Sequence, residues 1–337
     1  DDQIRLSSGT VRGGGIPIDK PSKYGPKTII EKLNKIQTEM PKAMLTIIYG
    51  GMTMTDLIPA SIAKEDFIKH GRSANYLYQT AVRWTTAIEP WLDYYKRNKK
   101  RDVRGLFHLK KMSDLDGTLN DYFVLSNELK AELKNHLTGL CMNAGLSLSK
   151  CERAFNKAAQ TAKVREFKNK YWSRGQATWD TFYNISKART DVSWSKKTPH
   201  LMSAPFRNPN NPRIANWLKE NIEAEFKTDT WNFELNFEQG APGMAYLEFK
   251  PNVTPHVSGG NVVVMDANSP IEEFSVKWTI RHEYGHILRM PDCYVEFYDE
   301  KEEVAVNYQL DVTDLMCSRA GDMNDRIYNE LKRVYYK

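Results

Sequence analysis

Apolar residues recur every three or four positions through most of the first two hundred residues. This spacing places them on one face of a helix, and Lys, Glu and Ala fill many of the positions between them. Clear cases are KTIIEKLNKIQTEM, SNELKAELKNHLTGL and SKCERAFNKAAQTAKVREFKNKYW. We therefore predict a mainly helical domain over residues 26–197, preceded by a Gly-, Ser- and Pro-rich extended arm at residues 1–25.

The pattern changes beyond SWSKKTPHLMSAPFRNPNNPRI, a segment broken by prolines and asparagines. A helix is expected over NPRIANWLKENIEAEF, with Pro212 in its first turn. Three segments then alternate in polarity or contain β-branched runs, as strands do: TWNFELNFE, GMAYLEFKP and GNVVVMDA. IEEFSVKWTIRHEYGHIL returns to helical spacing. The pattern predicts a second domain over residues 198–337, and an α+β fold class for the whole chain.

Charge divides the chain at the same place. Residues 1–200 contain 34 Lys and Arg against 20 Asp and Glu, a net charge of +14, whereas residues 201–337 contain 14 against 22, a net of −8. Such asymmetry indicates two differently built regions. The basic stretches YKRNKKRDVR (95–104) and KVREFKNKYWSR (163–174) are interleaved with aromatic residues. They fit an anionic surface or glycan as partner, a solvated helix face, or contact with the acidic half.

The four cysteines form two local pairs along the chain. We predict disulfides Cys141–Cys151 and Cys293–Cys317, although four cysteines permit three connectivities and reduced core cysteines are the alternative. Disulfides require an oxidising compartment, and a chain that starts at Asp1 without methionine fits a processed amino terminus. A secreted, extracellular or periplasmic location is therefore expected. No run of about 18 apolar residues predicts a membrane span.

RHEYGHILRMPDCY, residues 281–294, contains the strongest candidate chemistry. His282 and His286 are four residues apart, so on a helix both imidazoles can reach one metal ion. Glu283 can then accept a proton from a metal-bound water, the arrangement typical of HExxH peptidases. Asp292 follows the helix-ending Pro291 and can supply a third ligand if the chain turns back. The alternative is an amphipathic helix with two incidental histidines.

Two neighbouring features favour the metal site. Gly285 lies in mid-helix between the histidines, where glycine costs roughly 1 kcal/mol relative to alanine. We therefore expect another part of the chain to approach the helix backbone there. DLMCSRAG, residues 314–321, then places Met316 in a turn-like context.

These residues resemble the metzincin zinc peptidases, whose motif HExxHxxGxxH or HExxHxxGxxD is followed by a methionine-containing turn. HEYGHILRMPDCY is similar above all to the HExGHxLGLPDxY pattern of snapalysin-like bacterial enzymes. The resemblance covers about residues 280–320. It implies a mixed twisted sheet with an active-site helix, and one zinc ion held by His282, His286 and Asp292. It also implies Glu283 as general base and Met316 beneath the metal.

The chain departs from that family at two positions. Arg289 stands where the motif has a glycine that commonly takes a positive φ, a conformation costly for arginine. Ser318 stands where some metzincins have a tyrosine two residues after the methionine.

Metzincin clefts are bordered by an antiparallel edge strand that pairs with extended substrate. HVSGGN occupies the corresponding place, which implies that Ser258, Gly259, Gly260 and Asn261 bind substrate. A plain hairpin turn on the two glycines is equally compatible.

Other assignments remain open from the sequence. Glu302 or Glu303 could be the third ligand, as in gluzincin peptidases, and EFYDEKEE (296–303) could bind calcium or form a solvated acidic loop. The expected function is that of a zinc-dependent endopeptidase acting on protein or peptide. The alternative is a non-catalytic or latent metal-containing protein whose basic half binds an anionic partner. In a latent enzyme, Asp114 or Asp116 could block the metal.

Overall fold

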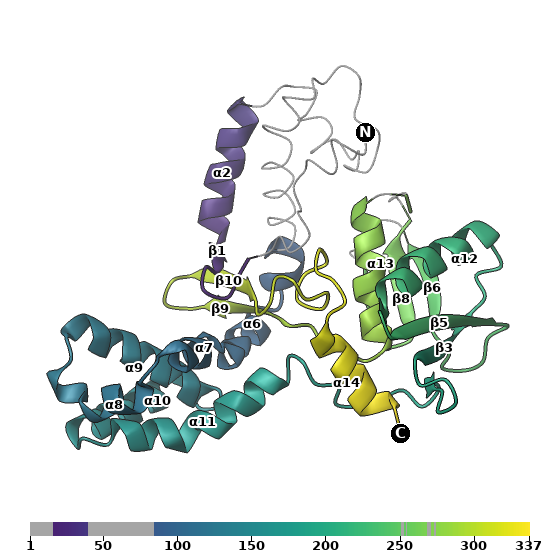
Figure 1. Cartoon of the computed structure of the whole chain (residues 1–337). Coiled ribbons are helices and arrows are strands. Elements are labelled where there is room, and N and C mark those ends of the chain that lie inside the picture. The colour runs from purple at the N-terminus through teal and green to yellow at the C-terminus, as the bar shows by residue number, and fades with distance from the viewer. Residues whose placement is uncertain (1–15, 40–83, 251–252, 254, 268–270, 273) are drawn as a thin grey trace.

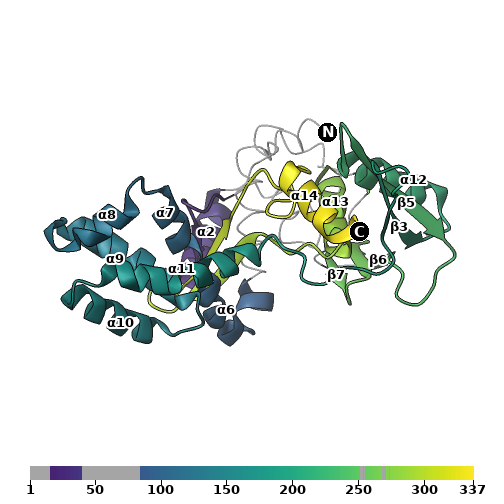
Figure 2. The same ribbon diagram turned by 60° about the horizontal axis from the view of Figure 1, so that its bottom comes forward.

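The computed structural model describes residues 16–39, 84–250, 253, 255–267, 271–272 and 274–337. A helical body and a mixed helix–sheet body lie at opposite sides, and a β-hairpin lies between them (Figure 1, Figure 2). The predicted α+β class is confirmed. No helix in these ranges is long and apolar enough to cross a membrane.

The helical body buries an apolar core of its own, which includes Leu106, Leu133 and Phe155. The predicted Cys141–Cys151 disulfide joins two of its helices. Ser126 caps one of these helices by accepting a hydrogen bond from the Leu129 N–H at 3.2 Å. The elements of this body are α7 (Arg104–Lys111), α8 (Leu115–Asn120), η4 (Tyr122–Val124), α9 (Asn127–Met142), α10 (Leu148–Gln160) and α11 (Val164–Asp180).

The mixed body is built on strands that run in the order β4-β5-β3-β6-β8-β7. β3 is parallel to β5. A single parallel bridge between Phe206 of β3 and Ala245, the residue before β6, connects β3 to β6. β6 is parallel to β8, and β7 lies antiparallel at the outer edge. The short β2 pairs with the start of β3. The strands are β2 (Ser193–Trp194), β3 (Leu201–Arg207), β4 (Lys227–Thr228), β5 (Trp231–Glu238), β6 (Tyr246–Lys250), β7 (His256–Ser258) and β8 (Val262–Asp266).

β3 is a strand that the sequence pattern did not predict. Met202, Ala204 and Phe206 alternate as buried residues along it, as in an ordinary strand. The alternation was obscured because Pro205 lies within the strand and further prolines and asparagines lie just outside it. The segment at the predicted domain boundary therefore contains the first long strand of the sheet.

Helices pack against the sheet, and this packing fixes the orientation of the helix that carries His282 and His286. The predicted helix before the strands is present, and so is the motif helix, whose Ile280, Tyr284 and Ile287 are fully buried. The Tyr284 ring contacts Phe226 and Phe233 at centroid distances of 5.8 and 5.4 Å. The helices are α12 (Pro212–Leu218), which continues as η5 (Lys219–Glu223), α13 (Phe274–Ile287) and the C-terminal α14 (Asp325–Tyr335).

The hairpin of β9 (Tyr294–Asp299) and β10 (Val304–Gln309) connects the two bodies. The extended end of the predicted arm, β1 (Ser22–Tyr24), pairs with β10. α2 (Pro26–Glu39), η2 (Trp84–Ile88), α6 (Leu92–Asn98) and η3 (Lys99–Arg101) follow β1 in the described sequence. Ile29, Trp84, Ile88 and Tyr95 bury their side chains around Ala305 of the hairpin.

Lysines from the N-terminal half neutralise the acidic tip of this hairpin. Lys99 Nζ lies 2.8 Å from Asp299 Oδ2, Lys96 Nζ lies 3.1 Å from Glu300 Oε1, and Lys23 Nζ lies 2.5 Å from Glu302 Oε2. The basic stretch 95–104 therefore contacts the acidic half, one of the three alternatives left open by its sequence. The 296–303 segment is a strand and a turn rather than a loop.

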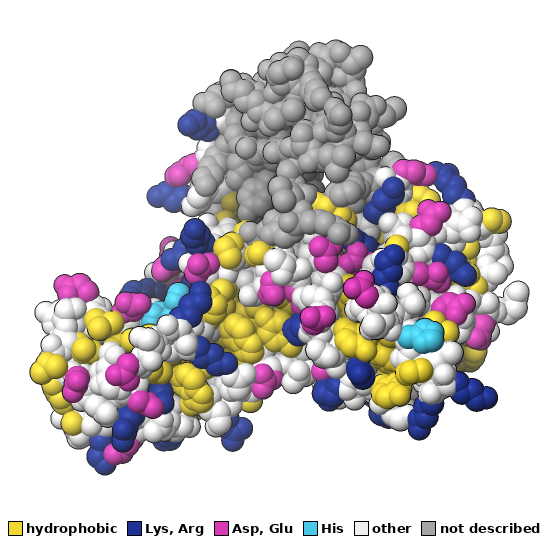
Figure 3. Space-filling model, viewed as in Figure 1, with side chains coloured by type: hydrophobic (Ala, Val, Ile, Leu, Met, Phe, Trp, Pro, Cys, Tyr) yellow, Lys and Arg dark blue, Asp and Glu magenta, His cyan; other side chains and the backbone are white. Residues whose placement is uncertain are grey.

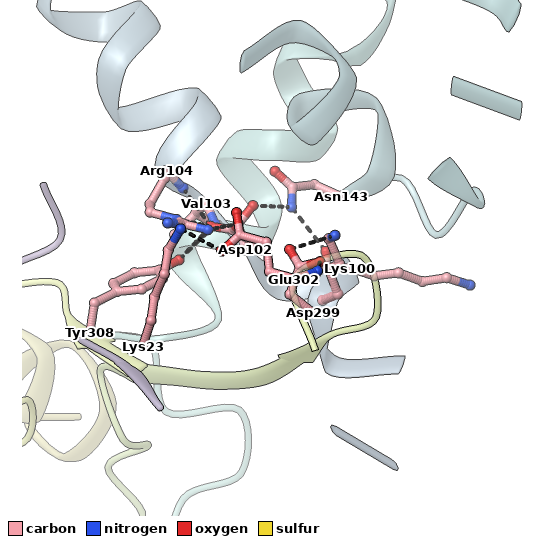
Figure 4. A network of polar contacts seen from close by, with 10 residues as sticks. Lys23, Lys100, Asp102, Val103, Arg104, Asn143, Asp299, Glu302 and Tyr308 are labelled. Atoms are coloured by element: carbon pink, nitrogen blue, oxygen red, sulfur yellow. Dashed lines mark hydrogen bonds and ion pairs between the residues drawn. The ribbon is translucent and has the colours of Figure 1, made fainter. Parts of the chain in front are cut away.

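Beneath these ion pairs lies a buried hydrogen-bond network (Figure 4). The Tyr308 hydroxyl donates to Asp102 Oδ1 at 2.9 Å and accepts from the Val103 N–H at 3.0 Å. Arg104 donates to both oxygens of Asp102, at 2.9 and 2.6 Å. Burial holds the pKa of Tyr308 well above its ordinary value, so this hydroxyl keeps its proton. The network fixes the helical body to the hairpin that begins two residues after Asp292.

Candidate metal centre

His282 and His286 project together from the last two turns of α13. Their ring centroids are 4.8 Å apart. His282 Nδ1 lies 2.8 Å from the Leu315 carbonyl oxygen, and His286 Nδ1 lies 2.9 Å from that of Met290. A carbonyl can only accept, so each Nδ1 carries a proton, and Nε2 is the nitrogen left to bind a metal once it is unprotonated. Both histidines are therefore held in the tautomer that binds a metal through Nε2.

The chain reverses direction immediately after α13. The Met290 N–H donates to the Gly285 carbonyl at 3.0 Å and the Arg289 N–H donates to that of His286 at 2.9 Å. This is the hydrogen-bond pattern of a Schellman turn, which requires a left-handed residue between the two donors. Arg289 adopts that conformation, with φ of 68°. The arginine thus takes the backbone geometry expected of the motif's glycine, at a cost of order 1 kcal/mol.

The reversal brings Asp292 back to the histidines. Its Oδ1 lies 3.3 Å from His282 Nε2 and 3.1 Å from His286 Nε2. This oxygen is inaccessible to solvent, and the two imidazole nitrogens are its polar neighbours. One oxygen and two nitrogens thus converge, and all three atoms lie within 4.8 Å of one another.

This donor set fits a catalytic zinc ion. Two imidazole nitrogens and a carboxylate oxygen are ligands that zinc prefers, and three protein ligands leave a fourth position for water. The buried Asp292 carboxylate is costly without a cation beside it, and a metal ion at this point supplies one.

Without a metal, a proton is the available cation. Burial would lower the pKa of His286, but the adjacent carboxylate of Asp292 outweighs it and raises this pKa to about 9. Burial would likewise raise the pKa of Asp292, yet its contacts with His282 and His286 hold it well below the ordinary range. A metal ion must therefore displace a proton from His286 at neutral pH.

Met316 lies directly against the motif helix. A Cβ added to Gly285 would collide with the Met316 sulfur. The close approach expected at this glycine is therefore present, and the approaching group is the methionine of the predicted turn. A side chain at position 285 would push Met316 away from the helix turns that carry His282 and His286.

A disulfide and a buried carboxylate hold the turn in place. The predicted Cys293–Cys317 bond joins the residue after Asp292 to the residue after Met316. The Met316 N–H donates to Asp314 Oδ1 at 2.8 Å, and Arg326 Nε donates to Asp314 Oδ2 at 2.7 Å. Cys293 and Cys317 also lie near Asp314, but their sulfurs are bonded to each other and bind no metal.

Glu283 is buried beside this centre, with 4% of its side chain exposed. Arg319 Nη2 lies 3.7 Å from its Oε1. Sequence reasoning missed Arg319, because a single arginine in a turn has no pattern; its position three residues after Met316 was the available signal.

The predicted substrate-binding residues form the turn between β7 and β8. The Asn261 N–H donates to the Ser258 carbonyl at 3.2 Å, and Gly259 and Gly260 have φ of 57° and 74°. Arg289 Nη2 lies 3.4 Å from Asn261 Oδ1, which ties this turn to the reversal after α13. The predicted hairpin turn is thus present, and the Arg289–Asn261 contact brings the end of strand β7 close to the candidate metal centre.

The remaining candidates lie elsewhere. Glu302 pairs with Lys23 at the hairpin tip, and the adjacent Glu303 is exposed. Neither lies in the group formed by His282, His286 and Asp292, so the geometry favours Asp292 over either glutamate as third ligand. Asp114 caps α8 by accepting from the Gly117 N–H, and Asp116 pairs with Lys168. Both are in the helical body and do not block the centre.

We predict that the Asp292 charge is visible in the titration of His286. In metal-free protein one imidazole should titrate near pH 9. In Asp292→Asn the pKa of His286 should fall, because burial is then opposed only by the Glu283 charge and the contact with the Met290 carbonyl. NMR titration of the histidine resonances, assigned with His286→Gln, checks this. If every imidazole of the wild type titrated near its ordinary pKa, the proposed charge pairing would be wrong.

Removing the local disulfide should weaken metal binding. We expect Cys293→Ser/Cys317→Ser to lower zinc affinity about tenfold or more, since the segment that carries Asp292 loses its tether to the turn that carries Met316. Calorimetric titration with zinc measures this. Cys141→Ser/Cys151→Ser is the matched control, because that disulfide lies in the helical body, and equal losses in both variants would contradict the local role.

Three comparisons with known proteins identified no relative of this chain. No protein-family model matches the chain, and neither the curated proteins nor the solved structures yield a match.

Proposed function

We propose that the protein is a zinc-dependent endopeptidase of the metzincin type. The observation that carries this proposal is the convergence of His282 Nε2, His286 Nε2 and Asp292 Oδ1, beside a buried glutamate. A structural metal site needs no neighbouring base, whereas a hydrolytic one does.

Three features of the surroundings support the metzincin type. Met316 lies under the motif helix, and Arg289 takes the backbone conformation expected of the motif's glycine. The antiparallel strand β7 is at the sheet edge, where the resemblance requires a substrate-pairing strand. An extended peptide can add to that edge by main-chain hydrogen bonds.

In this proposal, separate residues bind the metal and transfer the proton. A zinc ion, when bound, polarises the scissile carbonyl and acidifies a water molecule. His282, His286 and Asp292 hold the ion, and the Leu315 and Met290 carbonyls keep both imidazoles oriented. Glu283 accepts the water proton at its carboxylate and delivers it to the departing amine. Both transfers take place in a largely buried site, where electrostatic effects are strong.

Two disulfides suit an oxidising compartment, so we propose a secreted or periplasmic location.

The alternative role, binding of an anionic partner, has less support. The basic stretch 95–104 supplies Lys96 and Lys99 to the acidic hairpin. In the second stretch, Arg165, Lys170 and Arg174 remain exposed on α11. On the face seen in Figure 3, Lys and Arg are interspersed with Asp and Glu over both bodies rather than gathered in one patch. This mixture favours a solvated surface over a polyanion site.

Cleavage of a diverse peptide library tests the proposal, with Glu283→Gln and Glu283→Ala run beside the wild type and metal content recorded for each. We expect cleavage by the wild type only, with rates at least about a hundredfold lower in both variants and zinc retained in all three. Equal cleavage by the variants would assign the activity elsewhere. Bound zinc without cleavage by the wild type would favour the latent or binding role.

A further inference from the structure

Arg319 is a cation at the boundary between the centre and solvent. Its side chain is 46% exposed, whereas that of the Glu283 it faces is 4% exposed. At 3.7 Å, their contact is longer than a hydrogen bond. No hydrogen bond or second ion pair holds this guanidinium within the described residues. Its donors are therefore available to a bound molecule.

Neighbouring arginines, unlike Arg319, form hydrogen bonds or close ion pairs within the described part of the chain. Three others around the centre are held by internal acceptors: Arg281 by Glu225, Arg326 by Asp314, and Arg289 by Asn261. Each of these supports the fold. Arg319 has no such structural partner, so its position beside Glu283 calls for another explanation.

The backbone that presents Arg319 is rigid. The Cys317 and Ser318 N–H groups both donate to the Asp314 carbonyl, at 3.1 and 2.9 Å, and the Gly321 N–H donates to that of Ser318 at 2.8 Å. The Cys293–Cys317 disulfide anchors the same turn. These bonds hold the backbone at residue 319, and the half-exposed side chain brings its guanidinium to Glu283.

A guanidinium left on the general base would compete with the water for the Glu283 carboxylate. A productive site therefore requires a better acceptor that draws Arg319 away. A second carboxylate meets this need, because arginine binds it through two parallel hydrogen bonds.

We propose that Arg319 binds a carboxylate of the substrate next to the scissile bond, so that the site prefers acidic peptides. The inference rests on the proposed peptidase function and adds its substrate class. The carboxylate can be an Asp or Glu side chain, or the free C-terminus of a short peptide. Both present the same chemistry to the arginine.

Binding by the metal-free protein tests this without any cleavage. The probes are hexapeptides with a single Glu moved along the sequence, their Gln counterparts, and versions with free or amidated C-termini. By calorimetry, the wild type should bind the best carboxylate peptide about fivefold more tightly than its amide counterpart. The position of the effective carboxylate distinguishes side chain from terminus.

Three variants make the test specific. Arg319→Gln should abolish the difference, Arg319→Lys should keep part of it, and Arg165→Gln, an exposed arginine of α11, should keep all of it. Equal binding of carboxylate and amide peptides by the wild type, no binding of either, or a preference that survives Arg319→Gln would overturn the inference. If the protein cleaves nothing, an Arg319-dependent preference still stands, and a peptidase without this preference would refute only the inference.

Discussion

The geometry of the candidate centre depends on the reversal of the chain after α13. The packing of Tyr284 and Ile287 in the sheet core fixes the orientation of this helix and with it the direction of the two histidines. A left-handed residue at Arg289 then turns the chain so that Asp292 faces them. Arginine occupies a conformation that glycine adopts more easily. Its side chain offsets some of this cost by reaching Asn261 in the β7–β8 turn, so the departure from the motif links the centre to the edge strand.

The same loop connects the centre to the rest of the molecule. Two residues beyond Asp292 the chain enters β9. The β9–β10 hairpin forms ion pairs with lysines of the N-terminal half, and its Tyr308 donates a hydrogen bond to Asp102. The opposite charges of the two halves are thus partly neutralised within the chain. A long basic run followed by an acidic one can indicate an internal interface as well as an external partner, and the N-terminal half here serves at least the first purpose.

Local chemistry explains which features could be predicted from the sequence. The histidines, the helix around them and the two disulfides follow from short-range spacing, and the cost of a mid-helix glycine indicated the approach of Met316. β3 and the β9–β10 hairpin were missed because Pro205 and the charges of EFYDEKEE obscure the alternation of strands whose burial depends on distant partners. Arg319 had only a weak signal, its position three residues after Met316, since its contact with Glu283 arises only when residues 36 apart in sequence meet in the folded chain. The order of the sheet is likewise a long-range property that no single segment encodes.

Zinc X-ray absorption spectroscopy on the protein loaded with one equivalent of zinc examines the proposed centre itself. We expect one tightly bound ion with two nitrogen ligands at about 2.0 Å and oxygen ligands completing a four- or five-coordinate shell. Asp292→Asn, which keeps the size of the side chain, should lower the affinity. Sulfur ligands, additional histidines, or a zinc shell unchanged when His282 and His286 are replaced would contradict the centre described above.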